Sequence, residues 1–193
     1  MKIVIIDYGA GNIQSVQFAI ERLGYTAILS SDPNEIITAD KVIFPGVGQA
    51  ESALKKLQEQ ELDVLIPTLK QPVLGICLGM QLLCASTEEG NVKGLGVFDL
   101  AVKRFDQHLK VPQIGWNQIQ DLKSSLFTGV ATDSFVYLVH SYFVPQSVHT
   151  ICSSNYGGLY STGIQRDNFY GVQFHPEKSS SVGAKILANF LAL

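Results

Sequence analysis

The chain has few residues that could form disulfide bonds or bind zinc. It contains three cysteines among 193 residues, Cys77, Cys84 and Cys152, and no two of them form a CxxC pair. The odd number and the wide spacing exclude both a disulfide framework and a zinc-finger arrangement. A cysteine with a special role in this chain should therefore act as a free thiol.

The sequence also lacks long apolar runs and concentrated charge. No stretch approaches the roughly 20 consecutive apolar residues of a membrane-spanning helix, and the start, MKIVIIDYG, has the pattern of a strand followed by a turn. The 14 lysines and arginines are scattered and the formal net charge is −3, so no basic stripe indicates nucleic acid. We therefore expect a cytoplasmic protein without a cleaved signal, whose partners include neither a membrane nor a nucleic acid.

Apolar residues, by contrast, are plentiful. They make up 46% of the chain, which at this length predicts one compact domain over residues 1–193. In the first 86 residues, β-branched runs alternate with amphipathic segments. The expected strands cover residues 2–7, 25–30, 41–46 and 72–77, and the expected helices cover 13–24, 32–39, 49–70 and 78–86. This alternation predicts βαβ crossovers and a parallel sheet that binds ligands at the carboxyl ends of its strands.

The pattern changes after residue 90, where strand-like pieces are separated by turns and not by helices. These pieces cover residues 96–105, 111–120, 134–145, 149–156, 159–166 and 169–177. A last helix is expected over 181–193, with the serines at 179–181 supplying its N-cap. The predicted fold class is therefore α/β, with three α/β/α layers and a mostly parallel mixed sheet that gains antiparallel strands in the C-terminal half.

The motif that points most clearly to chemistry is GICLG at residues 75–79, where an expected strand ends at Cys77. It matches the G-x-nucleophile-x-G elbow with cysteine in place of serine. The helix after it would direct free backbone N–H groups at the sulfur, which favours a thiolate and can stabilise an oxyanion. A buried cysteine in a tight turn has the same pattern, so this motif alone leaves both interpretations open. Cys84 and Cys152 are expected in the core.

A thiol nucleophile needs a base, and His175 is the best placed of the four histidines. It follows an apolar strand in FHPEK, and Glu177 comes two residues later. If this segment stays extended, both side chains point to the same side and the carboxylate can fix the imidazole tautomer. A His-x-Glu pair is also common on surfaces. Its combination with the elbow predicts a Cys77–His175–Glu177 triad, with His140 nearby as a histidine whose hydrogen bonds are satisfied.

Two glycine-containing turns follow other expected strands. In PGVG, residues 45–48, the glycines allow backbone N–H groups to face inward as an anion cradle, although an ordinary turn has the same composition. DYGAGN, residues 7–12, lacks the full GxGxxG spacing and an acidic residue at the end of the next strand. We interpret it as a turn, and we predict no dinucleotide, no other cofactor and no metal.

Taken in order, PGVG, GICLGMQLL and HPEKS resemble the motifs of the class I, triad-type glutamine amidotransferases, and the resemblance extends from residue 3 to residue 190. DYGAGN, IGWN at 114–117 and HSYF at 140–143 are similar to the family of glutaminase subunits of imidazole glycerol phosphate synthase. The resemblance implies a flavodoxin-like class I amidotransferase fold. It also implies hydrolysis of L-glutamine to glutamate and ammonia through a cysteinyl thioester.

The same resemblance implies a partner. In that family the ammonia passes to a (β/α)8-barrel cyclase subunit, HisF, in a heterodimer. The cyclase converts the ribulosyl phosphate intermediate PRFAR to imidazole glycerol phosphate and AICAR in histidine biosynthesis. Asn12 and Trp116 match positions that face this cyclase. From the residues alone, Trp116 beside Gly115 could equally pack in the interior.

The resemblance assigns roles to the other motifs residue by residue. Cys77 matches the nucleophile, His175 the base and Glu177 the third triad member. The positions that match the oxyanion-stabilising backbone are Gly46, Val47, Gly48 and Leu78. The positions that match the binding site for glutamine are Gln81, Glu89, Ser141 and Tyr142.

Two other functions remain open. A glutaminase subunit of another ammonia-channelling complex, such as pyridoxal phosphate synthase or anthranilate synthase, would share the class motifs, although GWN argues against it. A non-catalytic, flavodoxin-like interaction subunit could dock a partner at the same edge of the sheet. Such a binding module would have no need of a complete Cys–His–Glu set.

Overall fold

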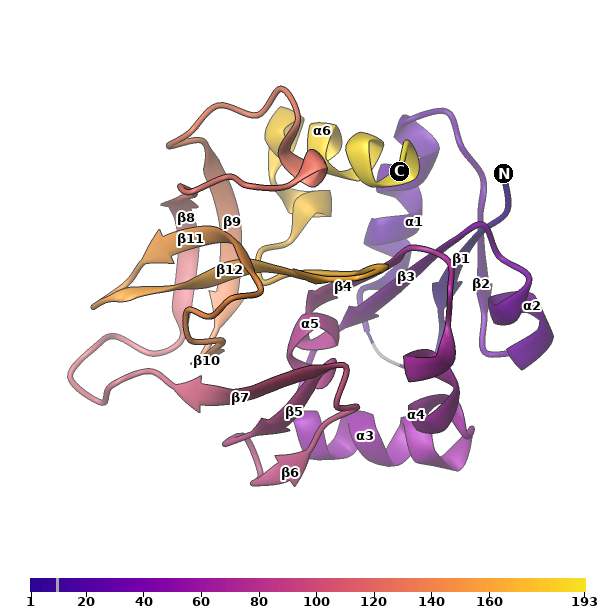
Figure 1. Cartoon of the computed structure of the whole chain (residues 1–193), viewed down its shortest axis with the longest axis horizontal. Coiled ribbons are helices and arrows are strands. Elements are labelled where there is room, and N and C mark those ends of the chain that lie inside the picture. The colour runs from indigo at the N-terminus through magenta and orange to yellow at the C-terminus, as the bar shows by residue number, and fades with distance from the viewer. Residues whose placement is uncertain (10) are drawn as a thin grey trace.

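The structure is a computed structural model that describes residues 1–9 and 11–193. Its centre is a seven-stranded sheet in the order β11-β12-β13-β4-β3-β1-β2 (Figure 1). Five neighbouring strands are parallel: β1 (Ile3–Ile6), β2 (Ala27–Ser30), β3 (Lys41–Gly46), β4 (Val73–Cys77) and β13 (Phe169–Val172). Two antiparallel strands extend it at one edge: β11 (Thr150–Asn155) and β12 (Leu159–Arg166). The prediction of a mostly parallel sheet with added antiparallel strands is confirmed.

Helices cover both faces of this sheet, which gives the expected three layers (Figure 1). One face carries α1 (Ile13–Arg22) and α6 (Ser180–Leu191), and the other carries α3 (Ala50–Glu59), α4 (Leu62–Leu65) and α5 (Leu78–Leu82). The short helix α2 (Pro33–Ile37) lies near β2 at the sheet edge. Within the described residues, the 3-10 turns are η1 (Ile66–Thr68), η2 (Ser125–Phe127) and η3 (Pro176–Lys178).

Four of the parallel strands, β1, β3, β4 and β13, bury both of their faces, whereas the edge strand β2 is partly exposed. In β1, Val4 and Ile6 pack into the core under α3 and α5, while Ile3 and Ile5 pack into the core under α1 and α6. Alternate side chains of a strand point to opposite faces, so a strand between two helical layers must be apolar at every position. This explains the continuous apolar runs of the sequence.

The chain after α5 departs from the expected helix over residues 78–86. The helix ends at Leu82, and β5 (Cys84–Thr87) begins two residues later. Strand β5 pairs with β7 (Phe98–Arg104), so this tertiary pairing overrides the helical pattern. Cys84 is buried, as expected, but in a strand. Its small sheet also contains β6 (Val92–Lys93) and β10 (Tyr142–Phe143).

A separate two-stranded ribbon consists of β8 (Gln113–Gln118) and β9 (Phe135–His140). Ser179 ties this ribbon to α6. The serine precedes the helix, yet its side chain makes no cap hydrogen bond, so the expected capping is wrong in this detail. Its hydroxyl instead donates to the carbonyl of His175 at 2.7 Å and accepts from the amide of Tyr137 at 2.9 Å. These bonds fix the ribbon against the segment that carries His175.

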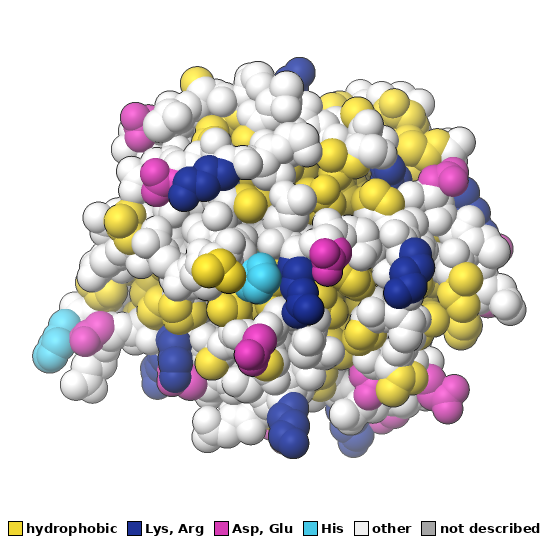
Figure 2. Space-filling view, viewed as in Figure 1, with side chains coloured by type: hydrophobic (Ala, Val, Ile, Leu, Met, Phe, Trp, Pro, Cys, Tyr) yellow, Lys and Arg dark blue, Asp and Glu magenta, His cyan; other side chains and the backbone are white. Residues whose placement is uncertain are grey.

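Charges are dispersed over the surface. On the face shown in Figure 2, Lys and Arg side chains are interspersed with Asp and Glu, and neither sign forms a stripe. The longest helix described, α6, has 12 residues, and within residues 1–9 and 11–193 no helix combines the length and apolar character that crossing a membrane requires.

Candidate active site

Three adjacent strands end at one edge of the sheet and bring the predicted motifs together. Cys77 is the last residue of β4, and Gly46, the last residue of β3, lies directly opposite it in the register. On the other side of β4, β13 leads into the segment that contains His175. This is the carboxyl edge of the parallel strands, where ligands bind in sheets of this type.

The turn at Cys77 has the conformation of a nucleophile elbow. Its φ of 54° and ψ of −111° place a residue with a side chain in a strained region of backbone space. The two flanking glycines are required by close backbone contacts. A Cβ at Gly75 would lie 2.8 Å from the amide nitrogen of Met80, and one at Gly79 would lie 1.9 Å from the carbonyl oxygen of Phe44. The elbow therefore accepts no larger residue at Gly75 or Gly79 without rearrangement.

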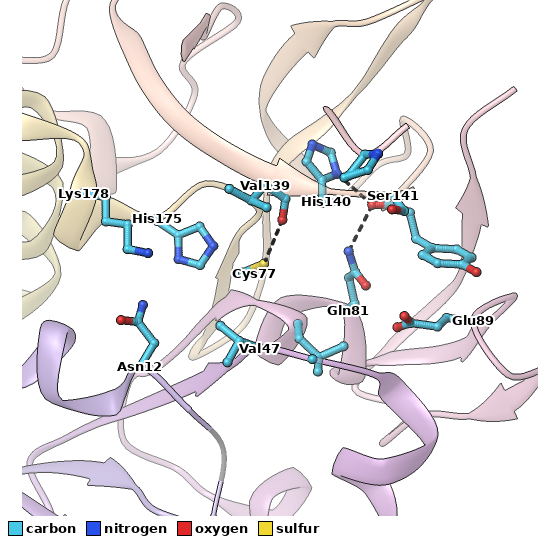
Figure 3. A pocket seen from close by; sticks show the side chains of 14 residues that line it. Asn12, Val47, Cys77, Gln81, Glu89, Val139, His140, Ser141, His175 and Lys178 are labelled. Carbon is cyan, nitrogen blue, oxygen red and sulfur yellow. Dashed lines mark hydrogen bonds between the residues drawn. The ribbon is translucent and has the colours of Figure 1, made fainter. Parts of the chain in front are cut away.

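The Cys77 sulfur is buried among polar groups. Figure 3 shows it between His175 and Gln81, with Val139 on a third side. The thiol donates to the carbonyl of Val139 at 3.8 Å, and the side-chain amide of Gln173 donates to the sulfur at 3.7 Å. These are long, weak contacts that suit a polarisable sulfur atom.

His175 and Glu177 form the predicted pair, although by a different route. The 3-10 turn η3 begins at Pro176, so the segment does not stay extended as expected. The turn still brings the Nδ1 atom of His175 to 2.8 Å from the Oε1 atom of Glu177, and both side chains are buried. The same carboxylate oxygen accepts from the side-chain amide of Asn12 at 3.0 Å. Asn12, a residue selected for a partner interface, thus contacts the predicted third triad member.

The charge of His175 is set by opposing effects. Burial lowers its pKa, while hydrogen bonds and charge interactions with Cys77 and Glu177 raise it, and the result is a pKa of about 10. The imidazolium form is therefore favoured at neutral pH. The pKa of His140 changes in the opposite direction, because burial lowers it to about 4 and the nearby His175 charge adds to this effect. The same site thus raises the pKa of one imidazole and lowers that of the other.

The predicted oxyanion segment lies beside the elbow. Val47, Gly48 and Leu78 line the same cavity as Cys77, and the φ of +94° at Gly48 is one that glycine adopts freely. Behind this segment, the buried Tyr8 hydroxyl donates to the carbonyl of Pro45 at 3.2 Å. Burial and the Cys77 charge both raise the pKa of Tyr8, so this phenol stays protonated as a donor.

The cavity at this edge has a volume of about 360 Å³, within the usual range for small-ligand sites. Ten of the residues selected from the sequence line it: Asn12, Val47, Gly48, Cys77, Leu78, Gln81, Glu89, Ser141, Tyr142 and His175. Gly46 and Glu177 line an adjoining hollow with His175. Trp116 is the one selected residue that lines neither space.

Two of the side chains that line the cavity, those of Gln81 and Glu89, can accept hydrogen bonds from a ligand. The Nε2 atom of Gln81 donates to the carbonyl of Tyr142 at 3.0 Å and to the Oε1 atom of Gln173 at 2.8 Å. Both donors of this amide are occupied, so its oxygen is the atom available to a ligand. Glu89 accepts from the amide of Ala50 at 3.0 Å, and burial raises the pKa of its carboxyl group against the effect of that bond.

Trp116 lies on the ribbon of β8 and β9 and is 53% exposed. It packs edge to face on Tyr137, with ring centroids 5.9 Å apart. Ile114 and Phe135 are exposed at the same face of the ribbon, as its register requires. The alternative of an interior tryptophan is therefore wrong. The ribbon reaches Val139, whose carbonyl contacts the elbow cysteine.

Sequence reasoning missed two residues that contact the elbow sulfur. Gln173 precedes His175 by two positions in an apolar segment. Residues two apart in a strand point to the same side, so this spacing could have indicated that Gln173 faces the site together with His175. Val139 contributes only a backbone carbonyl, so no feature of its side chain could have indicated it.

Comparison with known proteins agrees with this geometry. Residues 4–193 match the family model described as glutamine amidotransferase class-I. A crystal structure titled glutamine amidotransferase aligns with a TM-score of 0.79 at 15% identity, covering 100% of this chain and 98% of that one. The family-model match over residues 4–193, together with the fold and the cysteine elbow, defines a class I glutamine amidotransferase.

Closer relatives specify the family. The proteins named imidazole glycerol phosphate synthase subunit HisH from Bacteroides fragilis (strain YCH46) and from Yersinia pseudotuberculosis serotype I (strain IP32953) are 53% and 46% identical to the chain. Both alignments cover 100% of each protein. The chain belongs to the HisH family of imidazole glycerol phosphate synthase subunits.

Proposed function

We propose that residues 1–193 form one amidotransferase domain that hydrolyses L-glutamine at Cys77 and delivers the ammonia to a HisF cyclase subunit. The observation that carries the proposal is the assembly of Cys77, His175 and Glu177 beside one cavity. Full-length identity of up to 53% to proteins named as HisH supports the assignment to histidine biosynthesis. We place the reaction in the cytoplasm, since these relatives are named as subunits of a biosynthetic enzyme.

The geometry suits a two-stage acyl transfer. In the first stage, the Cys77 thiolate attacks the side-chain carboxamide carbon of glutamine, and the negative oxygen that forms faces the backbone N–H groups near Gly48 and Leu78. The His175 imidazolium gives its proton to the leaving nitrogen, which departs as ammonia and leaves a γ-glutamyl thioester. The raised pKa of His175 means that this proton is present at neutral pH.

In the second stage, water attacks the thioester carbon and His175 accepts a proton from that water. The carbon–sulfur bond breaks, glutamate leaves, and the thiolate–imidazolium pair is restored. Glu177 holds the imidazole in place by its 2.8 Å hydrogen bond. The sum of the two stages is one glutamine and one water consumed, with one glutamate and one ammonia produced.

The cavity can distinguish an amino acid from a simple amide. We assign the α-ammonium group of glutamine to the free oxygen of Gln81 and to the carboxylate of Glu89, because both are acceptors in the cavity wall. We assign the α-carboxylate to the backbone around Ser141 and Tyr142. A simple carboxamide would make none of these contacts.

The partner should dock on the ribbon of β8 and β9. The exposed Ile114, Trp116 and Phe135 form an apolar face that ends next to the elbow, through Val139. Exposed aromatic residues are enriched at the centres of protein interfaces. A cyclase bound there would cover the site from which ammonia leaves.

The test is to measure glutamine hydrolysis by the chain alone and after addition of a HisF cyclase with its ribulosyl phosphate substrate. We expect slow turnover alone and a large increase in the complex. Equal turnover with and without cyclase would contradict the coupling between the subunits. No turnover under either condition would instead favour the non-catalytic interaction subunit.

A further inference from the structure

A buried amide connects the substrate end of the cavity to the nucleophile. Gln173 follows β13 and is 0% exposed. Its Oε1 atom accepts from the Nε2 atom of Gln81 at 2.8 Å, and its Nε2 atom donates to the Cys77 sulfur at 3.7 Å. One side chain therefore touches both the residue assigned to substrate binding and the residue assigned to attack.

The orientation of this amide follows from a fixed reference. The carbonyl of Tyr142 can only accept, so the Gln81 group 3.0 Å from it must be the NH₂ group. The second hydrogen of that group faces Gln173, which must present its oxygen there. The NH₂ group of Gln173 then necessarily points to Cys77. Reversing Gln81 would place two acceptors against each other, and reversing Gln173 alone would place two donors against each other.

The strand pattern argues against a role in filling space alone. Val172 and Phe174, on either side of Gln173, both pack into the apolar core beneath α1 and α6. Gln173 points the opposite way, toward the site, as His175 does two residues later. An amide buried this deeply is costly unless its hydrogen bonds are made, and an apolar side chain would fill the same volume without that cost.

We propose that Gln173 is a positioning residue with two effects, which rests on the proposed function of the site. Its oxygen holds Gln81 with the carbonyl facing the cavity, ready to accept from the substrate ammonium. Its NH₂ group donates to the Cys77 sulfur, and a thiolate accepts such a bond more strongly than a thiol does. Because linked hydrogen bonds polarise one another, a ligand bound to Gln81 strengthens the donor that faces Cys77.

Two variants separate the effects. Gln173→Glu keeps an acceptor for Gln81 but removes the donor to Cys77 and places a negative charge beside it. Gln173→Met has nearly the same shape and removes both. Gln113→Met is the matched control, because Gln113 is also a buried glutamine but bonds to His140 and Tyr160 instead.

The first readout is the pH profile of Cys77 alkylation by iodoacetamide, which requires no glutamine. We expect Gln173→Met to move the midpoint upward by about one pH unit, because it loses a donor to a charged group. Gln173→Glu should move it further, because it also places a negative charge beside the sulfur. Gln113→Met should leave the midpoint in place. An unchanged midpoint in a folded Gln173→Met or Gln173→Glu protein would overturn the donor role.

The second readout is steady-state glutamine hydrolysis in the complex with the cyclase. Gln173→Met should raise KM for glutamine about tenfold, the typical effect of misplacing one hydrogen bond to a charged group. Gln173→Glu should lower kcat and leave KM within about twofold, a smaller change than one lost bond produces. Equal KM changes in both variants would overturn the orienting role. A wild-type complex without glutamine turnover would contradict the proposed function instead, and the alkylation profile would still decide the donor role.

Discussion

Replacement of Gly79 by alanine should destabilise the protein more than the same replacement at an exposed glycine does. A Cβ there would lie 1.9 Å from the carbonyl oxygen of Phe44, whereas contacts shorter than 3.0 Å are essentially never seen. Strand β3 and helix α5 would have to separate by at least 1.1 Å, the difference between these two distances. The neighbours are backbone atoms in a packed core, so no flexible side chain can move aside.

This separation has a cost in both stability and rate. Overpacking of a core typically lowers the free energy of unfolding by about 1–3 kcal/mol or more. Strand β3 also carries Gly46 opposite Cys77, so the shift moves the proposed oxyanion segment relative to the Cys77 sulfur. A misplacement of about 1 Å at reacting groups can lower turnover by about 100-fold. Glutamine-dependent turnover should fall by that factor even in the fraction of protein that remains folded.

The assay is urea unfolding of the isolated chain, combined with glutamine-dependent turnover in the cyclase complex. Gly24→Ala is the control, because no atom lies within 4 Å of its Cβ position and its φ of +86° accounts for the only strain. That strain should cost about 1–2 kcal/mol and leave turnover unchanged. The reasoning would be refuted if the two variants lost equal stability and Gly79→Ala kept wild-type turnover.

Three further predictions follow from the site. Glu177→Gln removes a partner that raises the pKa of His175, so the free energy of unfolding should be higher for the wild type than for the variant. This difference should be largest below pH 6.5 and should shrink as the pH rises through about 10. A difference that stays constant with pH in unfolding experiments would count against the ion pair. Of the three thiols, only Cys77 should react with iodoacetamide in the native protein at pH 8, because burial raises the pKa of Cys84 and Cys152 to about 12. Peptide mass spectrometry would identify the labelled cysteines, and labelling of Cys84 or Cys152 would contradict this prediction. Trp116→Ala should weaken cyclase binding by about 2 kcal/mol or more without a comparable loss of stability, and equal affinity by calorimetry would remove the ribbon from the interface.

The sequence predicted the features that depend on local pattern. Continuous apolar runs indicated the central parallel strands, and the alternation of Ile3 to Ile6 between two cores is what such runs require. GICLG and HPE lie at strand ends because short motifs of this kind encode a turn and its chemistry together. The turn at Cys77 and the pairing of His175 with Glu177 could therefore be anticipated from a few residues, although the 3-10 turn that makes this pairing could not.

Features that depend on distant parts of the chain could not be anticipated. The helical pattern after Leu82 gives way to β5, because pairing with β7 outweighs local preference. The contact of Asn12 with Glu177 joins residues 165 positions apart. Likewise, the bond from Gln173 to the elbow sulfur depends on which strands are neighbours, and a single sequence specifies that only indirectly.

The central claim is that Cys77 is the nucleophile of glutamine hydrolysis and that ammonia alone passes to the partner. The most direct test is the Cys77→Ala variant in complex with the cyclase, assayed with glutamine and separately with ammonium salt. The proposed function predicts that glutamine-dependent formation of the cyclase product is abolished while ammonia-dependent formation is retained. Undiminished glutamine-dependent turnover in this variant would contradict it.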